Sequence, residues 1–419
     1  MCKHEKFLYL LLCLFFISNF TFAQDTAKVM CYNLENYTPA DTSRNIYFRT
    51  ILSAIKPDIL VVEEITSQTS VDIFLNNVLK AVDPNYQAGR FIKSREYYYK
   101  DSTSNALFFN PAKFDFISNT PITTDQRDIN EFRLVHKTTQ DTIIVFGVHL
   151  NAGISDSASR AIEIDSLRAV TDKFPPGTNF LAAGDFNVYT GSEAAVQKLI
   201  DKTNAGYFLD PIDQIGDWHE NAGYAAIHTQ STRRSSGGLD DRFDLIFISQ
   251  AVNDAGGITY INNSYTAYGN DGQHFNKSIN EAPQNTAVPA EVAYALYSAS
   301  DHLPVYALFE FDKTTGIKNN KNITPQSFEL FQNYPNPFNP STNIGFRISH
   351  FGFVTLKVYD LLGREIATPV NEFKQPGEYE ITFNAANLNG RAAYLSSGIY
   401  IYQLKAGDFI QTKKFVLIR

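Results

Sequence analysis

The feature that most constrains the fold is a unit that recurs between residues 28 and 311, a short apolar segment that ends in a carboxylate, an amide or a histidine. Ile59 to Val62 is the clearest case, because Glu63 and Glu64 follow this apolar run directly. Unbroken runs of this kind are typical of strands buried on both faces. A carboxylate at the end of such a strand needs a partner, since burying an unpaired charge is costly.

Amphipathic helices are expected between these strands. Phe48, Ile51, Leu52 and Ile55 repeat at helical spacing, and Pro57 ends that helix. The alternation predicts a mixed α/β domain, whose polar segment 251–289 reads as a long loop that shapes a substrate site. Further strands are expected at 28–32, 106–109, 142–148, 179–183, 245–248 and 305–311, and further helices at 71–79, 159–173 and 193–200.

Composition bounds the function. The net charge of −8 argues against bulk capture of polyanions, although a local basic groove or a bound cation can still serve a nuclease. Cysteine occurs only at Cys2, Cys13 and Cys31, which excludes a disulfide-rich scaffold and a cysteine-based zinc site. With 419 residues, the chain is long enough for two or three domains.

The amino terminus has the pattern of a secretory signal peptide over residues 1–23. Lys3 and Lys6 precede an apolar run over 7–20, and small residues lie near Ala23. The alternative is a membrane anchor, but the run is shorter than the roughly 20 residues that span a bilayer. No later stretch is long and apolar enough to cross a membrane, so we expect a soluble, exported and monomeric protein.

Each strand-end motif, taken alone, also has a purely structural interpretation. Asp185 could cap a turn, Asp244 could pair with Arg242 on the surface, and His302 could be a core histidine. Taken together and in order, they favour oxygen ligands and acid–base groups that converge on a hard divalent cation.

Six segments in this order resemble the endonuclease/exonuclease/phosphatase superfamily, which has the deoxyribonuclease-I-like fold. The resemblance implies an α+β catalytic domain over 24–312, built as a four-layer α/β/β/α sandwich with the site at one rim of two packed sheets. The segments are YN (32–33), PDILVVEE (57–64), VHLN (148–151), GDFN (184–187), RFDLIFIS (242–249) and SDHLPV (300–305).

The resemblance also implies a metal site. Glu64 would be the principal ligand of Mg²⁺, with Mn²⁺ and Ca²⁺ as alternatives. Asn33 and Asp301 would help to hold the metal or its waters, and Asn33 would also contribute to substrate binding.

The same resemblance implies the acid–base groups. His302 would be the catalytic histidine, oriented by Asp244, and Asp185 would position or deprotonate the attacking water. Asn187 would bind the scissile phosphate, and His149 would contact phosphate or assist the leaving group.

One departure concerns His149. The deoxyribonuclease branch pairs this histidine with a glutamate just before the strand at 106–109, and no glutamate stands there in this chain. The partner of His149 therefore stays open, with Asn105 and Asp101 as candidates. Arg233 and Arg234 either grip a phosphate backbone or lie in a solvated loop.

After a linker over 313–326, residues 327–419 read as a small all-β, immunoglobulin-like sandwich. They resemble a type IX secretion C-terminal sorting domain, which implies export through the periplasm and then secretion or attachment to the cell surface. The alternative is a plain binding module. The matching segments are FQNYPNPFNP (331–340), VYDLLGRE (358–365), LSSGIYIYQL (395–404) and KKFVLIR (413–419).

The sequence therefore predicts a secreted metal-dependent phosphodiesterase, with a nuclease acting on extracellular DNA or RNA as the leading hypothesis. A sphingomyelinase-like phospholipid hydrolase or a small phosphoester hydrolase is the alternative, because the metal and acid–base groups do not select the substrate. A non-catalytic surface binding protein is less well supported, since the Glu64, GDFN and SDH residues are all present.

Overall fold

A computed structural model of the chain describes residues 25–94, 104–254, 257–312, 328–349, 352–374, 377–388, 391–392, 395–407 and 409–418. The expected signal peptide and linker lie outside these residues. The chain divides into two compact units at Lys313. Within the described part of the chain, no helix has both the length and the apolar character that a membrane crossing needs.

The first unit contains two sheets. The larger sheet has the order β11-β13-β1-β2-β4-β3, with β12 also paired to β13. The second sheet has the order β5-β6-β7-β8-β10-β9. The larger sheet consists of β1 (Asp25–Tyr37), β2 (Ile59–Ile65), β3 (Gln87–Ala88), β4 (Ser104–Phe109), β11 (Ile258–Tyr260), β12 (Thr266–Ala267) and β13 (Val305–Phe311), and the second of β5 (Phe114–Ile122), β6 (Ile129–His136), β7 (Thr142–His149), β8 (Phe180–Asp185), β9 (Phe208–Leu209) and β10 (Asp244–Ser249).

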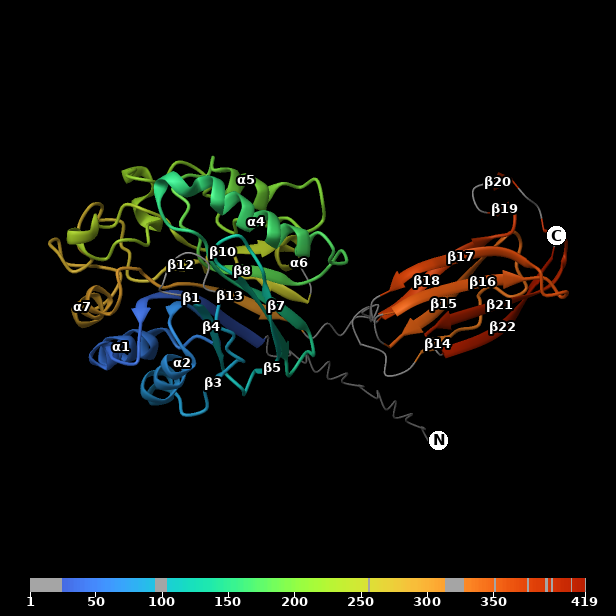
Figure 1. The fold of residues 1–419 in the computed structure, drawn as a ribbon, viewed down its shortest axis with the longest axis horizontal. Coiled ribbons are helices and arrows are strands. Elements are labelled where there is room, and N and C mark those ends of the chain that lie inside the picture. Colours follow the sequence, from blue (N-terminus) through green and yellow to red (C-terminus); the bar gives the residue numbers. More distant parts are fainter. Residues whose placement is uncertain are drawn as a thin grey trace, which may run out of the picture. The chain divides into compact units, whose positions relative to one another are not determined.

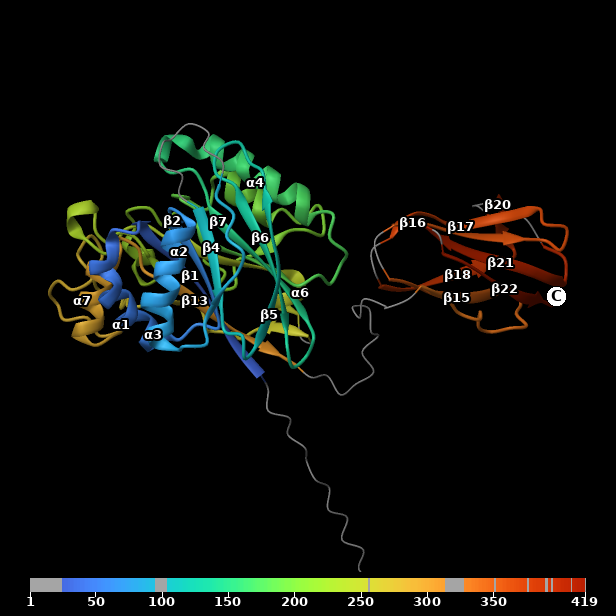
Figure 2. The ribbon, with the colours of Figure 1, turned by 60° about the horizontal axis from the view of Figure 1, so that its bottom comes forward.

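Helices cover the outer face of each sheet, as Figure 1 and Figure 2 show. The larger sheet carries α1 (Asn45–Ile55), α2 (Gln68–Phe74), α3 (Lys80–Val82) and α7 (Ala290–Ala299), and a π-helical segment, Leu75–Leu79, joins α2 to α3. The second sheet carries α4 (Ser157–Thr171) and α5 (Ala194–Ile200), and the short α6 (Gln250–Asn253) follows β10.

Three apolar cores separate these layers, because side chains alternate between the two faces of each strand. On β1, Met30 and Tyr32 pack under the helices of the larger sheet, whereas Val29 and Cys31 pack between the sheets. The second sheet alternates in the same way and buries Phe146 under α4 and α5. The first unit is thus the four-layer sandwich that the resemblance implies, and Cys31 is a core residue.

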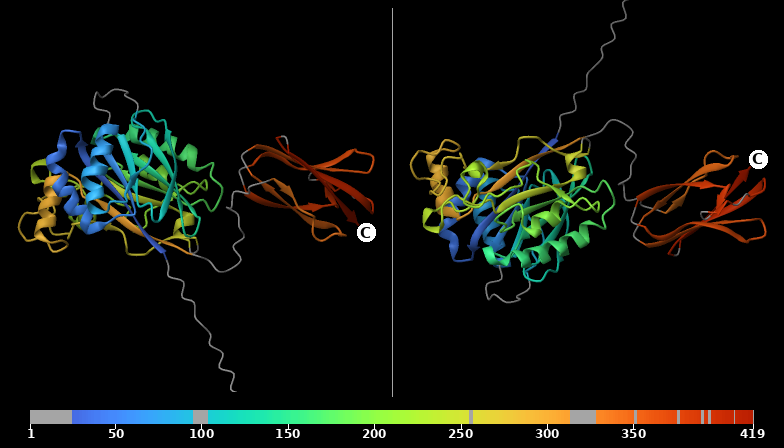
Figure 3. Two further views of the ribbon diagram at one scale, coloured as in Figure 1. Left: turned by 90° about the horizontal axis from the view of Figure 1, so that it is seen from below. Right: turned by 90° about the horizontal axis from the view of Figure 1, so that it is seen from above.

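The second unit is an all-β sandwich with one shared core, and Figure 3 shows its strands in two layers. Its sheets have the orders β14-β15-β18 and β17-β16-β21-β22, and β19 pairs with β20. The strands are β14 (Glu329–Leu330), β15 (Ser341–Ile348), β16 (Gly352–Tyr359), β17 (Glu365–Lys374), β18 (Gly377–Asn384), β19 (Asn387–Leu388), β20 (Arg391–Ala392), β21 (Gly398–Ala406) and β22 (Phe409–Leu417).

Most expected elements of the first unit are present. The strand expected at 28–32 is longer, Asp25–Tyr37, and the helix expected at 71–79 is a continuous helical stretch from α2 to α3. The sequence reasoning missed β3, β5, β6, β9 and α7. The segment 251–289 overlaps α6 and contains β11 and β12 in addition to irregular backbone.

Candidate active site

A histidine and an aspartate from different sheets form the centre of the site. Asp244 begins β10, and His302 lies three residues before β13. The Nδ1 atom of His302 donates to Oδ2 of Asp244 at 2.8 Å. Both side chains are buried. Burial opposes the charged imidazole, but the hydrogen bond to Asp244 and the carboxylates of Asp301 and Asp185 raise the pKa of His302 well above its usual value. The pair is therefore built to hold a proton on His302.

Asp185, at the end of β8, lies between the two histidines. Its Oδ2 is 3.9 Å from Nε2 of His302 and 3.6 Å from Nε2 of His149. The same oxygen accepts a hydrogen bond from Nδ2 of Asn33 at 3.1 Å, and Oδ1 accepts one from the backbone N–H of Asn187 at 2.9 Å. Burial raises the pKa of Asp185, which the charge on His302 opposes. Asp185 is thus a fixed, poorly solvated carboxylate suited to accepting a proton.

Glu64 reaches the same rim because β2 is irregular at its end. Glu64 has a left-handed φ of 57°, and the register of β2 shifts there against both β1 and β4. Bulges of this kind re-aim side chains and are common beside active sites. Its Oε2 accepts from the backbone N–H of Asn36 at 2.8 Å, and its Oε1 lies 3.7 Å from Nε2 of His149.

The side chain of Glu63 points the other way, into the protein interior. It is fully buried, and neither carboxyl oxygen has a hydrogen-bond partner among the described residues. Burial, with the nearby charges of Asp244 and Asp185, raises the pKa of Glu63 well above its usual value. Glu63 is therefore a core acid, and of the two glutamates only Glu64 is open to a cation from solvent.

The oxygen atoms at this rim are of the kind that hard divalent cations bind. Glu64 and Asp301 have side chains that are 18% and 24% exposed, so both carboxylates can be reached from solvent. Asn33 is buried, and its Oδ1 already accepts from the backbone N–H of Glu35 at 2.9 Å, which leaves one lone pair to offer. Among the described residues no set of three or more His, Cys, Asp or Glu is gathered around one point. Magnesium needs no such cage, because it is often held by one or two carboxylates and keeps several waters.

Arg127 is a site residue that the sequence reasoning missed. It lies in the turn between β5 and β6, and its Nη1 contacts Nε2 of His149 and donates to the carbonyl of Leu150 at 2.8 Å. Burial and the positive charge of Arg127 lower the pKa of His149 well below its usual value. His149 is therefore neutral, and Arg127 supplies the permanent cation beside it.

Two partners were expected for His149, and the described residues bear on only one of them. The Nδ2 atom of Asn105 donates to the carbonyl of Gly147 at 2.8 Å, and Asp101 lies outside the described residues.

Asn187 and Glu163 lie beside Arg127 and His149. Asn187 has a φ of 50°, and its Nδ2 donates to the same Leu150 carbonyl as Arg127 does, at 3.1 Å. Glu163, on α4, accepts the backbone N–H of Arg127 at 3.0 Å and that of Asn151 at 2.9 Å. One buried carboxyl group thus ties together the two loops that carry Arg127 and His149.

The remaining arginines of the motifs have structural partners. Arg233 makes a two-pronged contact with Glu35, at 2.6 and 2.9 Å, and Arg234 lies 3.0 Å from Glu281. Arg242 pairs with Asp210 at 2.8 Å. The alternative interpretation, in which Asp244 pairs with Arg242 on the surface, is therefore wrong.

Two family models match parts of this chain. Residues 30–302 match the Endonuclease/Exonuclease/phosphatase family, and residues 332–418 match the Secretion system C-terminal sorting domain. The second match indicates that the chain is secreted or attached to the cell surface. A search of curated proteins found no match.

Several solved structures are similar to this chain. A humanized TDP2 of D. rerio shares 17% identity, with 68% of this chain and 98% of that chain covered and a TM-score of 0.45. A family protein from Bacteroides thetaiotaomicron shares 17% identity, with 70% and 100% covered and a TM-score of 0.46. The catalytic domain of human Nocturnin shares 14% identity, with 69% and 98% covered and a TM-score of 0.46.

Proposed function

Since the chain belongs to the endonuclease/exonuclease/phosphatase family, whose members are phosphoester hydrolases, we propose that it is a secreted, metal-dependent phosphodiesterase that acts on extracellular DNA or RNA. The observation that carries this proposal is the meeting at one rim of a histidine–carboxylate pair, a second buried carboxylate and a cationic corner. The pair is His302 with Asp244, the carboxylate is Asp185, and the corner is Arg127 with His149.

These groups suit the charge changes of phosphodiester hydrolysis. Asp185 positions the attacking water and accepts its proton, and Asn33 holds that carboxylate in place. His302 transfers a proton at Nε2, the ring nitrogen that Asp244 leaves free. Arg127 and Asn187 donate to the phosphate oxygens, and the neutral His149 contacts the phosphate without repelling a further cation.

Glu64 and Asp301, with Asn33, would hold Mg²⁺, and Mn²⁺ and Ca²⁺ are the alternatives. The bound ion would polarise a phosphoryl oxygen and stabilise charge on the leaving oxygen.

The sorting domain supports the rest of the proposal. We assign residues 1–23 as a signal peptide, 24–312 as the catalytic domain, 313–326 as a linker and 327–419 as the sorting domain. On this assignment the chain is exported through the periplasm as a monomer and is then recognised by type IX secretion machinery.

The test is cleavage of supercoiled plasmid DNA and of RNA by the purified protein, with Mg²⁺ or with chelator, beside His302→Ala. Metal-dependent cleavage that is lost in the variant supports the nuclease. Cleavage of sphingomyelin or of small phosphoesters with nucleic acid left intact would instead favour the phospholipid or small phosphoester hydrolase.

A further inference from the structure

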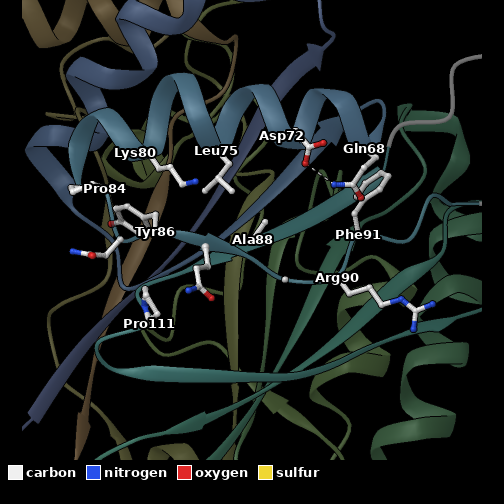
Figure 4. Close-up of a pocket in the computed structure, with 13 residues that line it drawn as sticks. Gln68, Asp72, Leu75, Lys80, Pro84, Tyr86, Ala88, Arg90, Phe91 and Pro111 are labelled. Atoms are coloured by element: carbon white, nitrogen blue, oxygen red, sulfur yellow. Dashed lines mark hydrogen bonds between the residues drawn. The ribbon is translucent and has the colours of Figure 1, made fainter.

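A groove of about 850 Å³ opens on the first unit between α2 and the segment that contains β3. Figure 4 shows Gln68, Asp72 and Lys80 along its helical wall, and Tyr86, Arg90 and Phe91 along the opposite wall. The helical wall runs from Gln68 to Lys80, which corresponds to about 18 Å at the rise of an α-helix. None of the six side chains belongs to the active site described above.

The groove leads to the active-site rim. Gln68 is the first residue of α2 and follows Glu64 by four positions. On the other wall, Ala88 pairs with Phe108, and the backbone N–H of Ser94 donates to Oγ of Ser104 at 3.0 Å. Ser104 in turn pairs with Ile65, next to Glu64. Both walls therefore approach the metal-binding carboxylate at the same end, where Figure 4 places Phe91 beside Gln68.

The cations of the groove are not neutralised. Arg90 is exposed, and its guanidinium makes no ion pair within the described part of the chain. Lys80 donates at 3.0 Å to Oδ1 of Asn76, which is a neutral partner. The carboxylate of Asp72 accepts from Nε2 of Gln68 at 2.9 Å. The groove thus offers two positive charges against one negative charge, on a chain that carries a net charge of −8.

The wall chemistry also distinguishes between substrates. Phe91 is partly exposed and lines the groove, while it also packs against the core under the helices of the larger sheet. Amide side chains line the same walls at Gln68, Asn85 and Gln87. Proteins bind single-stranded nucleic acid through positive charges that contact its phosphate backbone and through aromatic rings on which its bases stack. An acyl chain would need a continuous apolar lining, which this groove lacks.

We propose that this groove binds the single-stranded part of a nucleic-acid substrate that extends from the scissile phosphate. The proposal rests on the proposed function and deepens it, because it favours nucleic acid over phospholipid. Arg90 and Lys80 contact the phosphate backbone, and a base stacks on Phe91 near the rim.

The test measures binding without turnover. The probe is a fluorescein-labelled single-stranded oligonucleotide of about 12 nucleotides. Its anisotropy is followed with the full chain carrying His302→Ala. We expect Arg90→Glu to weaken binding about tenfold and to reduce the slope of log affinity against log salt by about 0.7. We expect Phe91→Leu, which keeps an apolar side chain but removes the ring, to weaken binding at least about fivefold.

Lys173→Glu is the matched control, because Lys173 is an exposed lysine just beyond α4, on the other helical layer. It makes the same charge change and should leave affinity unaltered. The proposal is overturned if the His302→Ala chain does not bind the oligonucleotide, if Arg90→Glu binds as tightly as its parent, or if Lys173→Glu weakens binding equally.

Hydrolysis of bis(4-nitrophenyl) phosphate separates the two proposals. This small diester reaches only the catalytic groups, so Arg90→Glu made in the protein that keeps His302 should hydrolyse it at the rate of the unaltered protein. Failure of the otherwise unaltered protein to hydrolyse it with metal would count against the proposed function. A loss of its hydrolysis in Arg90→Glu would mean that Arg90 acts on the catalytic groups and not through the groove.

Discussion

The Nε2 atom of Gln230 lies 3.0 Å from Nε2 of His302, at the edge of the imidazole opposite to the one that donates to Asp244. The imidazole ring of His302 is therefore held between a carboxylate and an amide. An amide carries both a donor and an acceptor, so Gln230 can serve the ring in either protonation state. Substrate must share or displace this contact to reach Nε2.

Replacing that amide with a carboxylate should change the pH profile. In Gln230→Glu a second negative charge would stabilise the imidazolium, so the limb of the kcat/KM profile governed by His302 should move to higher pH. Gln230→Met has a similar size and no charge, so the same limb of its kcat/KM profile should stay at the pH of the unaltered protein. The profile is measured with a small phosphodiester, and coincident profiles for the two variants would contradict this electrostatic role.

Glu64 and Glu63 form a matched pair for testing the metal. Glu64→Gln should raise the Mg²⁺ concentration needed for half-maximal activity at least about tenfold, the size of effects seen even for outer-shell changes. Glu63→Gln replaces a fully buried acid with an amide of the same shape and should leave that requirement unaltered. Rates are measured against free Mg²⁺ after chelator treatment. The opposite ranking of the two variants would show that Glu63 is the ligand.

Arg127 should act mainly on substrate binding. Arg127→Ala removes hydrogen bonds from a charged donor, which are worth about 1.5–3 kcal/mol each, so KM for a small phosphodiester should rise about 10-fold or more. Arg127→Lys keeps the charge but loses the planar guanidinium. Its KM should lie between those of the unaltered protein and of Arg127→Ala. Equal KM values for the alanine variant and the unaltered protein would exclude Arg127 from the phosphate site.

Glu163 makes stability depend on pH. Burial raises its pKa to about 7 from 4.5, although the backbone hydrogen bonds from Asn151 and Arg127 oppose this. The folded state then holds the proton more tightly than the unfolded state does, so the free energy of unfolding should fall as pH rises through this window, by roughly 3 kcal/mol. Urea unfolding across that range is the measurement.

Glu163→Gln cannot titrate and should lack this decline. Asp165→Asn removes an exposed carboxylate from the same helix and should keep it. Parallel pH curves for Glu163→Gln and the unaltered protein would rule out titration of Glu163.

The sequence revealed the residues that flank the ends of apolar strands, because an acid or histidine there stands out against its neighbours. Glu64, Asp185 and His302 were found in this way, and their predicted roles stay predictions until these variants are measured. Gln230 and Arg127 carried no such signal. Gln230 lies 72 positions from His302, and Arg127 lies 22 positions from His149, so only the folded chain brings them together.

The same limit explains the missed elements. β5 contains Pro121 and several polar residues, so its apolar alternation is weak, and it is recognisable mainly through its pairing with β6. The long first strand was shortened in the prediction because its polar end, from Asn33 to Tyr37, resembles a loop until β2 is placed beside it.

The histidine–aspartate pair spans two sheets that are joined here by an apolar layer, since His302 precedes β13 in one sheet and Asp244 begins β10 in the other. A ligand held by residues of both rims therefore bridges the two halves of the sandwich. By thermodynamic linkage, any such ligand stabilises the folded state by a free energy that grows with the logarithm of its concentration over its dissociation constant. The first unit should consequently become harder to unfold, and harder for proteases to open, wherever substrate and cation are abundant.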